Sequence, residues 1–131
     1  LRAMAIRLGH LGLEARCLGA DGRGGIQSGD LVVVGSGSGR TPVPLDQARA
    51  AHEAGAPLVA ITADPASPIA DLADHVIHIP ARVTPTNGTP HTLRSLFEES
   101  LLVVCDCVCR LLADRLGASA DDMQARHAPD Q

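Results

Sequence analysis

Hydrophobic residues along this chain form two kinds of pattern, short unbroken apolar runs and longer amphipathic stretches. The unbroken runs are typical of strands covered on both faces, and they occupy residues 31–34 and 57–62. Two further strand candidates, which include polar residues, lie over 13–18 and 75–79. The amphipathic stretches predict helices, over residues 1–11, 45–54, 68–73, 92–116 and 121–126. Strands alternating with helices at this spacing predict an α/β fold, with a parallel sheet built from βαβ units.

Helix boundaries are marked by small residues and by proline. Gly12, Gly55 and Gly117 follow three of the predicted helices, as expected of helix C-termini. Ser67 precedes Pro68 in the arrangement of an N-cap and a first helical residue. The chain opens at Leu1 inside a helical pattern without an N-cap. We therefore expect one domain over residues 1–131 that is incomplete at its N-terminal end.

A loop of glycines and hydroxyl side chains follows the run at 31–34 and leads into a helix. Ligands of parallel sheets bind beyond the carboxyl ends of strands, and the N-terminus of a helix favours an anion. We therefore predict a phosphate-binding loop with Thr41 as the helix N-cap; its ligand residues are Ser36, Gly37, Ser38 and Thr41. The alternative is a tight strand-to-helix loop without a ligand. Pro42 and Pro44 weaken the site, because neither has an amide N–H.

Composition and charge exclude several classes of function. The net charge of −4, with one Phe and no Trp or Tyr, argues against a nucleic-acid partner. No apolar run approaches the roughly 20 residues of a membrane span, so we expect no membrane partner. Four cysteines without a disulfide spacing indicate reduced thiols and a cytoplasmic location. Cys105 and Cys109 share a helix face with apolar neighbours, which favours core or interface residues over metal ligands.

Four stretches of the sequence resemble the SIS (sugar isomerase) domain family: residues 4–12, 29–41, 58–74, and 95–98 taken together with 125–128. The segments Ser95-Leu-Phe-Glu98 and Arg126-His127-Ala128 are similar to those of 6-phospho-3-hexuloisomerases within it. The resemblance implies a three-layer α/β/α sandwich of the flavodoxin-like, Rossmann-like type, here without the N-terminal strand of the family. It also implies a homotetramer in which a C-terminal tail, residues 118–131, contacts another subunit.

The implied reaction is an aldose–ketose type isomerisation, an intramolecular oxidoreduction of a phosphorylated sugar. It interconverts 3-hexulose 6-phosphate and fructose 6-phosphate through an enediol(ate), in the ribulose monophosphate pathway of formaldehyde assimilation, and it needs no metal or cofactor. One alternative is another SIS isomerase, such as one acting on arabinose 5-phosphate. The other is a non-catalytic regulatory domain that binds a sugar phosphate, which the bulky Arg94 at a glycine position favours.

The resemblance implies two catalytic residues, Glu98 and His127. Glu98 is the expected base, and burial beside Leu96 and Phe97 would raise its pKa toward neutrality. His127 is the expected proton relay or ring-opening residue. The alternatives are a carboxylate that complements the helix dipole and a solvated tail histidine. We interpret His10 as a packing residue.

Overall fold

The computed structural model describes residues 1–19, 25–81 and 95–127. The chain divides into two compact units. The helical unit comprises Leu1–Gly22 with Leu102–Gln131, and the sheet unit comprises Arg23–Leu101.

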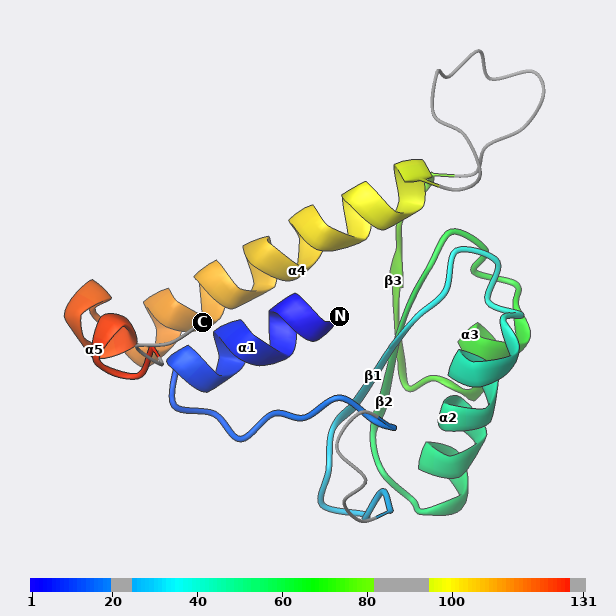
Figure 1. The fold of residues 1–131 in the computed structure, drawn as a ribbon. Helices are drawn as coiled ribbons and strands as arrows, with labels where there is room; N and C mark the ends of the chain where they lie inside the picture. Colours follow the sequence, from blue (N-terminus) through cyan, green and yellow to red (C-terminus); the bar gives the residue numbers. More distant parts are fainter. Residues whose placement is uncertain (20–24, 82–94, 128–131) are drawn as a thin grey trace. The chain divides into compact units, whose positions relative to one another are not determined.

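The sheet unit is built on three parallel strands in the order β1-β2-β3 (Figure 1). The strands are β1 (Val32–Gly35), β2 (Leu58–Thr62) and β3 (His75–His78). Val32 pairs with Leu58, and Val59 pairs with His75. The predicted α/β fold with a parallel sheet is therefore confirmed. No strand precedes β1 in the described part of the chain.

Two helices connect the strands and supply the core of this unit. Helix α2 (Pro42–Glu53) joins β1 to β2, and α3 (Pro68–Leu72) joins β2 to β3. The apolar side chains with almost no exposure come from both helices and from β1 and β2: Val34, Ala48, Ala51, Leu58, Ala60, Ile61 and Ile69. Ser67 is the N-cap of α3 as predicted, since its Oγ accepts the Ala70 N–H at 3.4 Å. Helix α2 begins at Pro42, as expected with Thr41 as its N-cap, and so starts three residues before the amphipathic stretch over 45–54.

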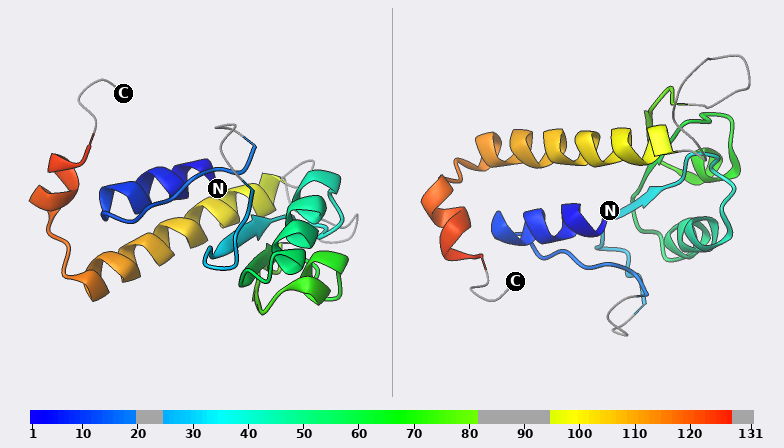
Figure 2. Two further views of the ribbon diagram at one scale, coloured as in Figure 1. Left: turned by 90° about the horizontal axis from the view of Figure 1, so that it is seen from below. Right: turned by 45° about the horizontal axis from the view of Figure 1, so that its top comes forward.

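The helical unit contains α1 (Arg2–His10), the C-terminal part of α4 (Ser95–Leu116) and α5 (Ala120–Ala125). Helix α1 lies alongside α4 (Figure 2), and Arg7 Nε lies 3.1 Å from Asp106 Oδ1 between them. Cys105 and Cys109 are buried on one face of α4, which confirms the sequence interpretation, whereas Cys107 is exposed. No described helix combines the length and apolarity that crossing a bilayer requires.

One predicted element is wrong. Residues 13–18 were expected to form a strand, but they are irregular, and residues 13–16 are exposed. Leu13 N–H donates to Leu8 O, so this segment finishes the C-terminal turn of α1. A strand needs a neighbour for its backbone groups, and β1, the nearest strand along the chain, pairs with β2. Residues 92–94 of the predicted long helix, and Ala128, lie outside the described residues.

Candidate functional site

The loop over residues 36–41 leaves the carboxyl end of β1 and stays attached to the end of β2. Ser36 N–H donates to Ile61 O at 3.0 Å, and Ala63 N–H donates to Gly37 O at 3.2 Å. These bonds extend the parallel pairing past the last residues of both strands. The loop therefore starts from a fixed position at the sheet edge where ligands of parallel sheets bind.

Two of the predicted phosphate ligands are brought together by this loop. Ser36 Oγ and Thr41 Oγ1 are hydrogen-bonded at 2.9 Å, and Ser36 Oγ also accepts the Gly39 N–H at 3.1 Å. Thr41 is the N-cap of α2 by position, but its side chain does not make the predicted cap bond. Its hydroxyl bonds Ser36 instead, so the loop and the helix start are tied to each other. Ser38 Oγ accepts the Arg40 N–H at 3.2 Å.

The backbone of this loop also offers free hydrogen-bond donors. Within the part of the chain that the structure describes, the amides of Gly37, Ser38 and Thr41 make no hydrogen bond, whereas those of Gly39 and Arg40 bond to serine hydroxyls. Unpaired amides in a glycine loop at a helix N-terminus are suited to an anion. Pro42 lacks an N–H, so these loop amides are the main donors available there.

Two glycines of the loop are required by close packing. Gly39 has φ +61°, and a Cβ there would lie 1.9 Å from Ser67 Oγ. A Cβ on Gly37 would lie 3.1 Å from Cγ of Phe97, which is buried in the first turn of α4. Glycine permits such close approach, and here the atoms that approach belong to the protein itself. The loop is thus held between α3 and the start of α4.

Arg40 connects the 36–41 loop to the loop that follows β2, and sequence reasoning missed it. Its Nη1 donates to Asp64 Oδ2 at 2.5 Å and to Ser38 O at 3.0 Å, and Nη2 donates to Ala66 O at 3.3 Å. The Asp64 side chain is 9% exposed and that of Arg40 is 52% exposed. Their positions in the sequence could have predicted this pair, because Arg40 and Asp64 each follow the carboxyl end of one of two neighbouring parallel strands.

The two expected catalytic residues lie in different units. Glu98 is in the sheet unit, next to Phe97 in the first turn of α4. Glu98 is exposed, so its expected burial is wrong: Phe97 occupies the inward face of this turn, and a neighbouring helical residue points about 100° away. Arg94, singled out as bulky, lies outside the described residues.

His127 lies just beyond α5 in the helical unit, where its ring stacks on His10 with centroids 4.9 Å apart. His10 thus packs against a candidate catalytic side chain. Arg126 Nη1 also donates to His10 O at 3.3 Å. Helix α5 has a capping box, in which hydrogen bonds from Ser119 lower the pKa of Asp122. The stacked rings and the Arg126 hydrogen bond to His10 together hold the end of α5 against the end of α1.

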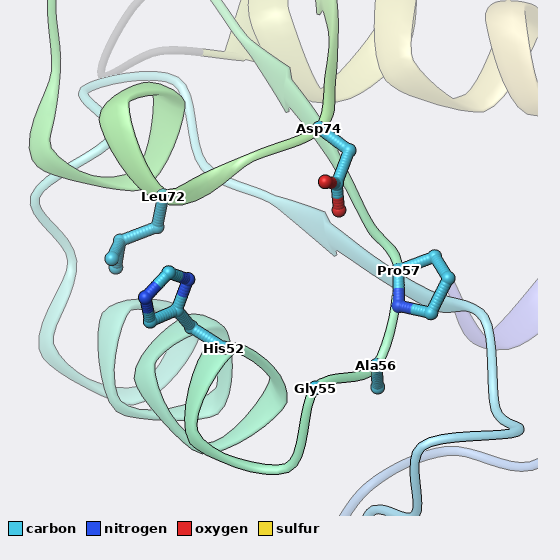
Figure 3. A pocket seen from close by; sticks show the side chains of 6 residues that line it. All are labelled: His52, Gly55, Ala56, Pro57, Leu72 and Asp74. Carbon is cyan, nitrogen blue, oxygen red and sulfur yellow. The ribbon is translucent and has the colours of Figure 1, made fainter.

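A pocket of about 260 Å³ lies near the amino ends of β2 and β3, away from the carboxyl ends where the 36–41 loop begins (Figure 3). It is lined by residues from the end of α2 and the entries to β2 and β3: His52, Gly55, Ala56, Pro57, Leu72 and Asp74. Its carboxylate is already engaged, because Asp74 Oδ2 accepts the Leu58 N–H at 2.8 Å. This pocket is separate from the 36–41 loop. Among the described residues, no three His, Cys, Asp or Glu side chains are grouped to hold a metal ion.

Comparison with known proteins identifies related sequences and folds. The SIS domain family model matches residues 20–96. A 3-hexulose-6-phosphate isomerase of Mycobacterium gastri is 41% identical, with 98% of this chain and 66% of the relative covered. The protein of the same name from Bacillus subtilis is 34% identical, with 97% and 71% covered. The chain thus spans about two thirds of the length of these relatives.

A solved structure is also similar to this chain over nearly its whole length. It is that of a hypothetical protein from Methanococcus jannaschii, described as inferring a molecular function of 3-hexulose-6-phosphate isomerase. It matches with a TM-score of 0.87 and 26% identity over 99% of this chain and 71% of that protein. The family model covers more than half of the sequence, and the B. subtilis relative is similar over most of both chains. The chain therefore belongs to the SIS domain family.

Proposed function

We propose that this chain forms most of a phosphosugar isomerase that interconverts 3-hexulose 6-phosphate and fructose 6-phosphate. The observation that carries the proposal is the 36–41 loop, with unpaired amides at Gly37 and Ser38 beside the start of α2. The relatives from M. gastri and B. subtilis that share this sequence carry that activity in their names. We further propose a cytoplasmic enzyme of the ribulose monophosphate pathway.

The loop binds the phosphate of the sugar. The amides of Gly37 and Ser38 and the hydroxyls of Ser38 and Thr41 donate to its oxygens, and the dipole of α2 adds a partial positive charge. The Ser36 hydroxyl supports the site by fixing Thr41 and Gly39. Held at this end, the sugar chain presents its carbonyl at one position, which lowers the entropic part of the barrier.

The chemistry is a proton transfer between adjacent carbons. The Glu98 carboxylate takes the proton from C2 of the 3-ketose, and the electrons of that C–H bond form the C2–C3 double bond of an enediol(ate). Glu98 then returns the proton to C3, while the O2 proton moves to O3, so that the carbonyl lies at C2. Glu98 is suited to this role by its place in the turn whose Phe97 packs on Gly37 of the loop.

His127 supplies the second proton-transfer group, acting on the sugar oxygens or on ring opening. We propose that it does so from a neighbouring subunit of a homotetramer, carried by the tail over residues 118–131. Stacking on His10 holds its ring in one orientation at the end of the helical unit.

The test is to incubate the purified protein with 3-hexulose 6-phosphate and to measure fructose 6-phosphate. Glu98→Gln should lower kcat by about 10²–10⁴-fold, the usual contribution of a general base, while the Kd for fructose 6-phosphate stays near its wild-type value. Glu99→Gln makes the same change one residue away and serves as the control. Unchanged turnover in Glu98→Gln rules out this base.

The wild-type protein separates the alternative functions. Turnover of arabinose 5-phosphate, with none of the hexulose, would identify another SIS isomerase. Binding of sugar phosphates with no turnover of either would identify a regulatory binding domain. Failure to bind any phosphorylated sugar would contradict the proposal altogether.

A further inference from the structure

Arg40 contacts both the 36–41 loop and the loop that follows β2. It reaches one carboxylate and two carbonyl oxygens, with distances of 2.5 Å to Asp64, 3.0 Å to Ser38 O and 3.3 Å to Ala66 O. Asp64 is itself fixed, since its Oδ1 accepts the Ala66 N–H at 3.3 Å. The contacts therefore join the loops that follow β1 and β2.

These bonds set the backbone orientation of the 36–41 loop. The guanidinium holds the Ser38 carbonyl, and the Arg40 N–H holds the Ser38 hydroxyl, so Ser38 is fixed from both sides. The peptide between residues 38 and 39 is planar, and its N–H donates to Ser36 Oγ at 3.1 Å. With these groups engaged within the loop, the amides of Gly37 and Ser38 stay available for an anion.

The positive charge of Arg40 is largely neutralised by the carboxylate of Asp64. The two side chains are 2.5 Å apart, and the carboxylate is almost fully buried, where an ion pair is only weakly screened by water. A cation paired in this way adds little net positive potential at a neighbouring anion site. The guanidinium therefore links the two loops by its several N–H donors as well as by its charge.

We propose that Arg40 and Asp64 form a clasp that holds the 36–41 loop in its anion-binding shape, with Arg40 a positioning residue. This inference rests on the proposed phosphate-binding function of the loop. The competing explanation is that Arg40 attracts phosphate directly by its charge. The two differ in the effect of Asp64. A clasp needs its carboxylate, whereas direct attraction is opposed by that negative charge.

The experiment uses Arg40→Lys, Asp64→Asn and their combination, with the Kd of fructose 6-phosphate and of inorganic phosphate measured by calorimetry. Lys keeps the charge but cannot reach three acceptors in two loops, and Asn keeps the shape of Asp without its charge. The clasp predicts that each single variant weakens binding by about tenfold. The double variant should be no weaker than either, because both break one unit. Arg49→Lys is the matched control, since Arg49 lies on α2 and pairs with the exposed Asp46.

Kinetics distinguish positioning from general loss of structure. KM should rise by about tenfold in both single variants while kcat changes by less than about threefold, because ground-state and transition-state binding are weakened alike. The clasp proposal is refuted if the Asp64→Asn variant binds the ligands as tightly as wild type or more tightly. It is also refuted if the Arg40→Lys variant keeps full activity. If Asp64→Asn does not fold, Arg40→Lys alone decides. A wild-type protein that binds neither ligand would instead refute the proposed function.

Discussion

At the residue scale, Gly39 is the position where the shape of the site depends most directly on the absence of a side chain. Its φ is +61°, and a Cβ would overlap Ser67 Oγ at 1.9 Å. Ser67 has no exposed surface and caps α3, so it has little room to move. We expect Gly39→Ala to lower the free energy of unfolding by about 2–5 kcal/mol, from backbone strain and overpacking together. Urea denaturation followed by circular dichroism measures this loss.

Gly55→Ala isolates the backbone part of that effect. Gly55 has a similar φ of +66°, but a Cβ there would have no atom within 4 Å. Its substitution should therefore cost about 1 kcal/mol, the usual penalty of the left-handed conformation. Equal losses in the two variants would show that the contact between the loop and Ser67 is not tight in solution.

At the element scale, the sequence predicted those elements whose signal is local. Ser67-Pro68 marked the start of α3, and the apolar runs marked the three strands. Residues 13–18 show the limit of this reasoning, because a short candidate segment becomes a strand only if a neighbouring strand pairs with its backbone groups. The hydroxyl of Thr41 is a second case: its partner, Ser36, is set by how the loop folds back. The glycine and serine content of the segment predicts an anion-binding loop, but it does not predict which hydroxyl groups bond to each other.

Helix α4 separates its cysteines into two environments, with a measurable chemical consequence. Burial raises the pKa of Cys105 and of Cys109, so the reactive thiolate is scarcer than in an ordinary thiol at pH 8. Cys107 is exposed on the opposite face. During brief treatment with iodoacetamide at pH 8, Cys107 should be alkylated at least about tenfold faster than the other two. Peptide mass spectrometry reads out each site.

Unfolding provides the control for this labelling. In concentrated urea the three thiols of α4 should react at similar rates, because burial is lost. Fast alkylation of Cys105 or Cys109 in the native protein would contradict the burial of that face of α4.

At the scale of the whole molecule, the candidate site could be predicted only in part. The phosphate loop follows from a local pattern, whereas Arg40 and Asp64 are 24 residues apart and become neighbours only when β1 and β2 pair. Glu98 and His127 came from family resemblance, since a lone carboxylate and a lone histidine carry no spacing signal. They belong to different compact units, so whether one subunit supplies both is a question of assembly.

Mixing two inactive variants answers that question. If His127 acts on the site of a neighbouring subunit, Glu98→Gln and His127→Ala chains that are refolded together in equal amounts complement each other. A site is then active when its own subunit keeps Glu98 and the neighbour keeps His127, which gives about a quarter of wild-type activity for random assembly. Residues acting within one subunit would give no recovery. Wild type mixed with the double variant is the control: about a quarter remains if the site is shared, and about half if each subunit is self-sufficient.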